Sequence, residues 1–263
     1  MKNLITNYIV NYVREYEKRD DISTTWRKPL VGFADANHKD ILNIRQATFE
    51  EHLMPSDVLE NPTIIIAYFV PFTKDIADSN IEGEYASEKW ELAYEETNEM
   101  FPKLNDYIIE KIEDMGYKAA VCKVAGDFDN AILKSKWSHR HMARVAGLGT
   151  FGINNMLITE EGCCGRYFSI VTNLPVSPDE PLKEENCLYK KKKSCGVCVK
   201  QCFSGALSFD NYDRFKCYEV CCTNKDNYEK LYGNKKHEKG KPKGGSEVCG
   251  KCVVNLPCSF KRP

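Results

Sequence analysis

The residues with the clearest chemical potential are cysteines in the last third of this 263-residue chain. They form two runs, and each run contains a Cys-x-x-Cys pair. The first run is Cys187, Cys195, Cys198 and Cys202, and the second is Cys217, Cys249, Cys252 and Cys258. Eight thiolates are the ligand count for two 4Fe–4S clusters with four cysteines each. The spacing therefore predicts a protein that transfers single electrons.

The first run resembles the end of the bacterial two-cluster ferredoxin motif, in which the fourth cysteine binds the other cluster. Two departures are that Phe203 replaces the usual proline and that the first ligand lies farther upstream. Crosswise pairing predicts one cluster on Cys187, Cys195, Cys198 and Cys258. It predicts the other cluster on Cys202, Cys217, Cys249 and Cys252. Cys221 or Cys222 could replace Cys217, because all three lie on one short segment.

A structural zinc site is the alternative, because two Cys-x-x-Cys pairs also make a Cys₄ site. Zinc would leave the four flanking cysteines without a role, so we favour the clusters. Three cysteines lie outside the pattern, namely Cys122, Cys163 and Cys164. We interpret them as small buried residues. A reactive thiol is a second interpretation for the Cys163–Cys164 pair, which follows Gly162.

The elements that must position these cysteines are predicted from apolar periodicity. Expected strands cover residues 30–36, 63–70, 117–123, 156–159 and 167–172. Expected helices cover residues 1–20, 85–115, with a division at Pro102, and 132–146. Alternating strands and helices are typical of an α/β domain. A proline-rich connector follows, so we expect an α/β domain over residues 1–175. We expect a ferredoxin-like α+β module with two clusters over residues 176–263.

Composition and charge indicate the compartment and the partners of the protein. The chain has 13 cysteines, an odd number, and no secretory signal, so we expect reduced thiols and a cytoplasmic protein. No apolar run approaches the roughly 18–20 residues of a membrane helix, so no membrane partner is expected. Residues 181–263 hold 18 Lys and Arg against 9 Asp and Glu. This excess could contact nucleic acid, but we favour lysines that offset the negative charge of the clusters.

A glycine segment provides a second motif. Residues 147–152 (GLGTFG) match G-x-G-x-x-G, but they follow a helical stretch instead of a strand, so we do not expect a dinucleotide site. With Asn154, residues 156–158, Gly162 and the cysteine runs, this segment resembles epoxyqueuosine reductase. That family contains the cobalamin- and iron–sulfur-dependent reductase of queuosine synthesis in tRNA. The chain resembles the reductive dehalogenases more distantly. The likeness covers roughly residues 28–260.

The resemblance implies cofactors and partners. It implies a cobalamin between the two domains, beside the family's glycine segment, which is matched here by Gly147, Gly149, Gly152 and Asn154. It implies that electrons come from a ferredoxin- or flavodoxin-type donor protein and pass through the clusters to the corrinoid, and that tRNA is a partner. The alternatives are a non-catalytic ferredoxin-type electron-transfer protein and a zinc-stabilised tRNA-binding module.

The sequence offers few candidate proton donors. The family has an aspartate shortly before its glycine segment, and Asp127 and Asp129 are the nearest carboxylates here, although they lie farther from the glycines. Either could act as a general acid if it were buried beside the substrate, but we favour a pair of loop carboxylates. His139 and His141 are two residues apart and therefore point to different faces of a helix. We expect them to be hydrogen-bonded within the protein or exposed.

Overall fold

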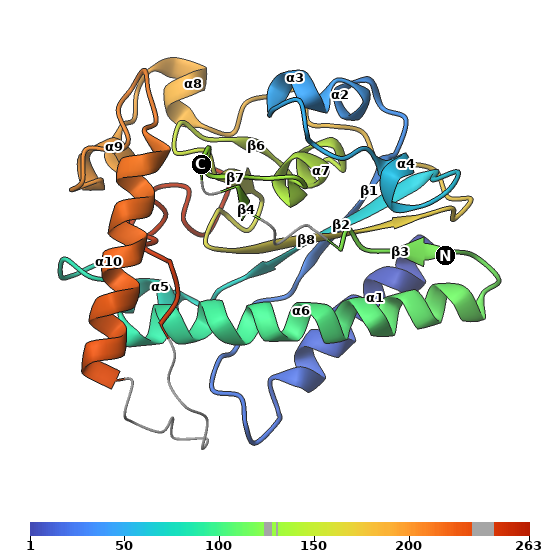
Figure 1. Ribbon diagram of the computed structural model, residues 1–263, viewed down its shortest axis with the longest axis horizontal. Helices are drawn as coiled ribbons and strands as arrows, with labels where there is room; N and C mark the ends of the chain where they lie inside the picture. Colours follow the sequence, from blue (N-terminus) through green and yellow to red (C-terminus); the bar gives the residue numbers. More distant parts are fainter. Residues whose placement is uncertain (124–127, 130, 233–244) are drawn as a thin grey trace.

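An open four-stranded sheet lies at the centre of the protein (Figure 1). The computed structural model describes residues 1–123, 128–129, 131–232 and 245–263. The strand order is β1-β2-β8-β3, and every neighbouring pair is antiparallel. The strands are β1 (Leu30–Asp35), β2 (Ile64–Pro71), β8 (Gly165–Thr172) and β3 (Ala119–Ala120). The expected mixture of helices and strands is confirmed, with an antiparallel sheet.

The second strand explains why the sheet is covered on both faces. All eight residues of β2 are buried. Ile64, Ile66 and Tyr68 belong to one apolar core, and Ile65 and Ala67 belong to another. Successive side chains of a strand point to opposite faces, so an uninterrupted apolar run requires a partner layer on each side.

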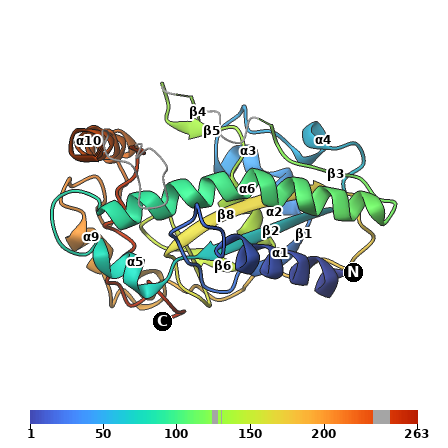
Figure 2. The same ribbon diagram turned by 90° about the horizontal axis from the view of Figure 1, so that it is seen from below.

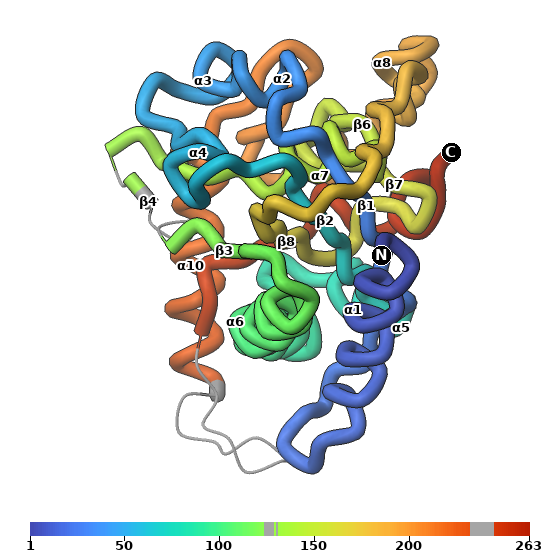
Figure 3. Tube along the Cα trace, turned by 90° about the vertical axis from the view of Figure 1, so that its right-hand side faces the viewer, coloured from blue at the N-terminus to red at the C-terminus, as the bar shows by residue number. Residues whose placement is uncertain are grey.

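One layer consists of helices α1 (Lys2–Tyr16), α5 (Lys74–Ser79) and α6 (Glu88–Asp114) (Figure 2). Helix α1 buries Ile5, Ile9 and Val13, whose spacing of four residues forms one apolar stripe. The long helix α6 begins at Ser87, whose hydroxyl accepts a hydrogen bond from the Trp90 amide. Figure 3 shows α6 end-on beside α1, under the sheet.

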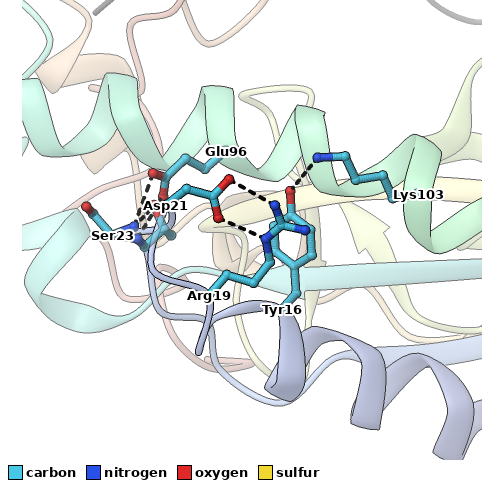
Figure 4. Close-up of polar contacts among 7 residues, drawn as sticks. Tyr16, Arg19, Asp21, Ser23, Glu96 and Lys103 are labelled. Carbon is cyan, nitrogen blue, oxygen red and sulfur yellow. Dashed lines mark hydrogen bonds and ion pairs between the residues drawn. The ribbon is translucent and has the colours of Figure 1, made fainter. Parts of the chain in front are cut away.

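A buried carboxylate fastens the segment after α1 to α6 (Figure 4). Glu96 is 1% exposed and accepts hydrogen bonds from the backbone amides of Ser23, at 3.1 Å, and Thr24, at 2.7 Å. Lys103 of the same helix donates to the Tyr16 hydroxyl at 3.2 Å. Hydrogen bonds to a charged acceptor are stronger than neutral ones, so Glu96 fixes how α1 approaches the sheet.

The other layer contains the glycine segment. Helix α7 (His139–Val145) packs on this face with three short helices, α2 (Lys39–Leu42), α3 (Ile44–Ala47) and α4 (Pro55–Val58). Two short hairpins flank α7. One pairs β4 (Phe128–Asp129) with β5 (Lys134–Ser135), and the other pairs β6 (Gly149–Phe151) with β7 (Leu157–Thr159).

The C-terminal part is mostly irregular around three helices, α8 (Leu188–Lys192), α9 (Val197–Gln201) and α10 (Arg214–Tyr232). The proline-rich connector before it is fastened to β1. Asp179 donates its backbone amide to the Phe33 carbonyl, and its carboxylate accepts from the Phe33 amide at 2.9 Å. The division into domains at residues 175 and 176 remains a prediction.

Three expectations for individual elements are wrong. Helix α6 continues through Pro102 without a division, because its buried face on both sides of the proline, including Phe101 and Leu104, packs on the core. The helix expected over 132–146 begins only at His139, because Lys134–Ser135 pairs as a strand and Trp137 hydrogen-bonds Ser169. The strand expected over 117–123 is reduced to β3.

Candidate functional site

The first predicted cysteine set surrounds one pocket. Cys187, Cys195, Cys198 and Cys258 all line it. The rest of the lining is mainly apolar and includes Ile153, Ile158, Leu256, Pro257, Gly152 and Asn154. Burial raises the pKa of the Cys198 thiol to about 12, and the nearby Cys258, Cys187 and Cys195 thiols add to the effect. The fold therefore brings Cys258 from the second run to three cysteines of the first run.

The second predicted set also gathers in space. Burial raises the pKa of the Cys252 thiol, and the charges of Cys249, Cys217 and Cys202 contribute. Cys217 and Cys221 lie one helical turn apart on α10, and a hydrogen bond between their thiols lowers the pKa of Cys217. Cys221 also lies close enough to Cys249 for their charges to interact.

Backbone and amide groups from the whole chain hold the segment that carries the last cysteines. Three asparagine side chains donate to its carbonyl oxygens: Asn80 to Cys249 at 2.9 Å, Asn154 to Cys252 at 2.7 Å and Asn224 to Val248 at 2.8 Å. The Leu207 amide donates to the Cys202 sulfur at 3.3 Å. Such hydrogen bonds orient metal ligands and tune the metal that they hold.

A lysine inside the second Cys-x-x-Cys pair is also engaged. The Lys251 ammonium is buried and donates to the carbonyls of Asn80 and Glu82, each at 2.9 Å. It lies close enough to the Cys249 thiol for their charges to interact. A buried cation next to thiolates is the arrangement expected where a negatively charged cluster must be offset.

The donor chemistry of both sets fits iron–sulfur clusters, since each consists of four cysteine thiols and the pocket around the first set is mainly apolar. Within residues 1–123, 128–129, 131–232 and 245–263, no three His, Cys, Asp or Glu side chains are arranged to hold a single metal ion. The four cysteines of a 4Fe–4S cluster bind four different irons, so they stand farther apart than the ligands of one ion. The ligand assignment remains a prediction.

The glycines approach the chain's own atoms. A side chain at Gly149 would bring its Cβ to 2.3 Å from the Ile158 carbonyl oxygen, across the β6–β7 hairpin. Gly147 has a φ of +74° and faces the Glu180 carbonyl, and Gly152 faces the Asn154 side chain. These residues shape the hairpin that borders the first cysteine set. Their role beside a corrinoid stays a prediction.

The cysteines outside the pattern are buried, as expected. Cys122 lies in the core of the α7 face, whereas Cys163 and Cys164 adjoin the C-terminal segment. The Cys163 amide donates to the Cys258 carbonyl at 3.0 Å, and the Cys164 thiol donates to the Val253 carbonyl at 2.9 Å. A hydrogen bond from the Cys163 thiol lowers the pKa of Cys258.

The two candidate proton donors are Asp127 and Asp129. Asp127 lies outside the described residues. Asp129 accepts from the backbone amides of Ala131, at 2.8 Å, and Ile132, at 3.3 Å, so it caps its own turn. His139 meets the Ser169 hydroxyl at 2.8 Å and His141 meets the Ser138 hydroxyl at 2.7 Å, so each histidine is hydrogen-bonded within the protein.

Burial, with a smaller effect of neighbouring cations, lowers the pKa of His139 to about 3 and that of His141 to about 4. Both histidines are therefore neutral at physiological pH. Sequence reasoning missed two arginines near His139, Arg140 and Arg166. Residues 26 positions apart give no local sequence signal, and only the packing of α7 on β8 brings them together.

No protein-family model matches this sequence, and no curated protein matches it. Within the described residues, no helix has both the length and the apolar character that a membrane span needs.

Comparison with solved structures identifies the fold. Epoxyqueuosine reductase from Streptococcus thermophilus superposes with a TM-score of 0.56 over 95% of this chain at 18% identity. An epoxyqueuosine reductase with a tRNA-Tyr epoxyqueuosine-modified stem loop gives 0.53 over 98% at 18% identity. This chain covers 66% of the length of each. A catabolic reductive dehalogenase with 3-bromo-4-hydroxybenzoic acid gives 0.52 over 89% of this chain and 30% of its own, at 16% identity. The resemblance predicted from the glycine segment and the cysteine runs is thus supported, and the chain has the fold of the epoxyqueuosine reductases.

Proposed function

We propose that this protein is an iron–sulfur reductase related in function to epoxyqueuosine reductase, with two 4Fe–4S clusters and a corrinoid as its cofactors. The observation that carries the proposal is the crosswise gathering of cysteines. Cys258 of the second run joins the pocket of the first run, and Cys202 of the first run lies near Cys252 of the second. Two-cluster ferredoxin motifs exchange their fourth cysteines in this way.

The proposed ligands follow from these two sets. Cys187, Cys195, Cys198 and Cys258 would hold one cluster, and Cys202, Cys217, Cys249 and Cys252 would hold the other. Cys221 is the alternative to Cys217, because their thiols are hydrogen-bonded to each other. When bound, the clusters supply one-electron transfer and the corrinoid supplies the difficult reductive chemistry. The protein's own residues position these groups and exclude water from them.

The two sets have different surroundings, which favours a direction for the electrons. Lys190, Lys191, Lys192 and Lys193 are all exposed, and this run begins three residues after Cys187. This basic surface suits an acidic donor protein of the ferredoxin or flavodoxin type, since complementary charge steers association. The second set lies instead beside Arg140 and Tyr212, toward α7 and the sheet. Electrons would enter at the first set and leave at the second.

Modified tRNA is the first substrate to test, because an epoxyqueuosine reductase with this fold is known in complex with a modified tRNA stem loop. The corrinoid part of the proposal rests on the shared fold, since the predicted glycines are engaged with protein atoms. The fold covers nearly the whole chain, including the cysteine runs. This extent favours a reductase over a simple electron carrier.

The experiment is a binding and turnover assay on protein purified without oxygen. The protein is incubated with cobalamin, desalted, and analysed for cobalt, and then mixed with a reductant and an epoxyqueuosine-containing stem loop. We expect about one cobalt per chain and loss of the epoxide. Iron without cobalt and without turnover would refute the corrinoid reductase and leave an electron carrier.

A further inference from the structure

Arg166 lies on a sheet edge that has no strand beside it in the described part of the chain, and Arg140 lies nearby on α7. Strand β8 pairs with β2 along its whole length, but it pairs with β3 only at Val171 and Thr172. The other edge of β8 is therefore unpaired from Gly165 to Ile170 among the strands that the structure describes. Arg166 lies on this part of β8, and α7 brings Arg140 close enough for the two positive charges to interact.

Among the described residues, Arg166 has polar and aromatic partners but no carboxylate partner. Its guanidinium lies 4.1 Å from the centre of the Tyr94 ring, and one Nη donates to Asn98 at 3.1 Å. Its Nε is buried and has no hydrogen-bond partner in the described part of the chain. An unpaired donor away from water costs free energy, and that cost is larger for a charged group.

Arg140 likewise has no carboxylate partner among the described residues. One Nη donates to the Asn155 carbonyl and contacts the Met156 sulfur at 3.3 Å. Burial is the main factor that lowers its pKa, and Arg166 lowers it further. Neither arginine forms an ion pair with any described carboxylate. The groups that act to raise the pKa of Arg140 are Tyr212, Tyr167 and Cys252, and Cys252 belongs to the second cysteine set.

The neighbouring histidine does not change this balance. His139 stacks on Phe168 with ring centres 4.1 Å apart and is neutral at physiological pH. A cluster bound by the second cysteine set would offset the charge of Arg140 from one side. Among the residues that the structure describes, Arg166 would still have no carboxylate partner, and its Nε would still have no acceptor. Tyr94 provides an aromatic surface for Arg166, and Phe168, two residues farther along β8, provides one for His139.

We propose that Arg166, supported by Arg140, binds an oxoanion of the substrate, either a phosphate or a carboxylate. Taking this position as part of the substrate site rests on the proposed reductase function. The substrate class is then a reducible molecule that carries its anionic group close to the second cysteine set. A phosphodiester of RNA and the carboxylate of a small molecule are two sources of the same chemistry.

The test measures anion binding by calorimetry on oxygen-free, cluster-loaded protein at constant ionic strength. Sodium phosphate, sodium acetate and a modified tRNA stem loop are the three probes. Arg166→Gln should weaken binding of the accepted probe by about tenfold or more, as expected for loss of a charge-assisted hydrogen bond. Arg166→Lys should bind that probe more tightly than Arg166→Gln but more weakly than the parent. The control is Arg144→Gln, because Arg144 already pairs with Asp40 at 2.7 Å.

Each outcome decides the proposal. Binding of the stem loop that depends on Arg166 would identify an RNA phosphate, whereas acetate binding that depends on Arg166 would identify a small carboxylate. Equal binding by the parent and Arg166→Gln, or no binding of any probe by the parent, would overturn it. If Arg166→Gln does not fold, the parent's own titrations and Arg166→Lys decide. Iron is counted on the same samples, so loss of the clusters is distinguished from loss of the anion site.

Discussion

Glu91 gives this protein an unusual dependence of stability on pH. Its side chain is fully buried on α6, and one carboxylate oxygen accepts from the Ser246 amide at 3.1 Å. The other oxygen has no hydrogen-bond partner in the described part of the chain. Burial raises the pKa of Glu91 from 4.5 to about 8, and the charge of Glu95 contributes. Folded protein therefore retains a proton that unfolded protein releases.

This difference in bound protons decides how the free energy of unfolding changes with pH. Between pH 4.5 and pH 8 the folded state binds more protons than the unfolded state, so the free energy of unfolding falls as the pH rises. Below this range both states are protonated, and above it both are ionised. At about 1.4 kcal/mol per pH unit, the loss reaches about 5 kcal/mol at most above pH 8.

Glu91→Gln removes the ionisable group and keeps an acceptor for Ser246. Near pH 5 the variant should match the parent, and above pH 8 it should be more stable. A difference of about 5 kcal/mol corresponds to roughly 10 °C or more in the thermal midpoint of a chain this long. The assay is thermal unfolding followed by circular dichroism from pH 5 to pH 9.

The matched control is Glu99→Gln, because Glu99 is an exposed residue on the same helix. Its midpoint should follow the parent at every pH. The reasoning about burial would be refuted if Glu91→Gln shifted the midpoint equally at pH 5 and pH 9. It would also be refuted if Glu99→Gln reproduced the effect.

Further predictions concern the cysteines and the hairpin. Cys252→Ser should lose about four irons per chain and loosen the C-terminal segment, whereas Cys222→Ser should keep its iron. Gly149→Val should lower the unfolding midpoint by an amount equivalent to about 1–3 kcal/mol, because the new Cβ would meet the Ile158 carbonyl. An unchanged midpoint would contradict the observed hairpin. Asn154→Leu should speed loss of iron to a chelator by removing the hydrogen bond to Cys252, and an unchanged rate would show that this bond does not hold the segment.

Strongly periodic or uninterrupted apolar segments were predictable from the sequence. The run at 63–70 identifies β2 almost to the residue, because a strand buried on both faces leaves a continuous apolar signal. Pro102 was misleading, since a proline is a breaker only when packing does not compensate for the lost hydrogen bond. Helix α6 has a buried face along most of its length, and that packing decides the outcome.

The site shows the same contrast. Cysteine spacing predicted two sets of thiols, and the structure places Cys187, Cys195, Cys198 and Cys258 around one pocket. Their role as cluster ligands stays a prediction. The side chains that hold the cysteine segment, such as Asn80 and Asn224, could not be predicted, because they meet it only through tertiary packing. The proximity of Arg140 and Arg166 could not be predicted for the same reason. The strand register and the position of α7 bring them together, and neither has a sequence signature.

The central claim is that two crosswise sets of cysteines hold two 4Fe–4S clusters, and a metal count tests it most directly. Protein purified without oxygen would be analysed for iron, acid-labile sulfide and zinc per chain. Protein with two 4Fe–4S clusters should contain about eight irons and about eight sulfides, with little zinc. Zinc in place of iron, at one or two ions per chain, would contradict the redox function altogether.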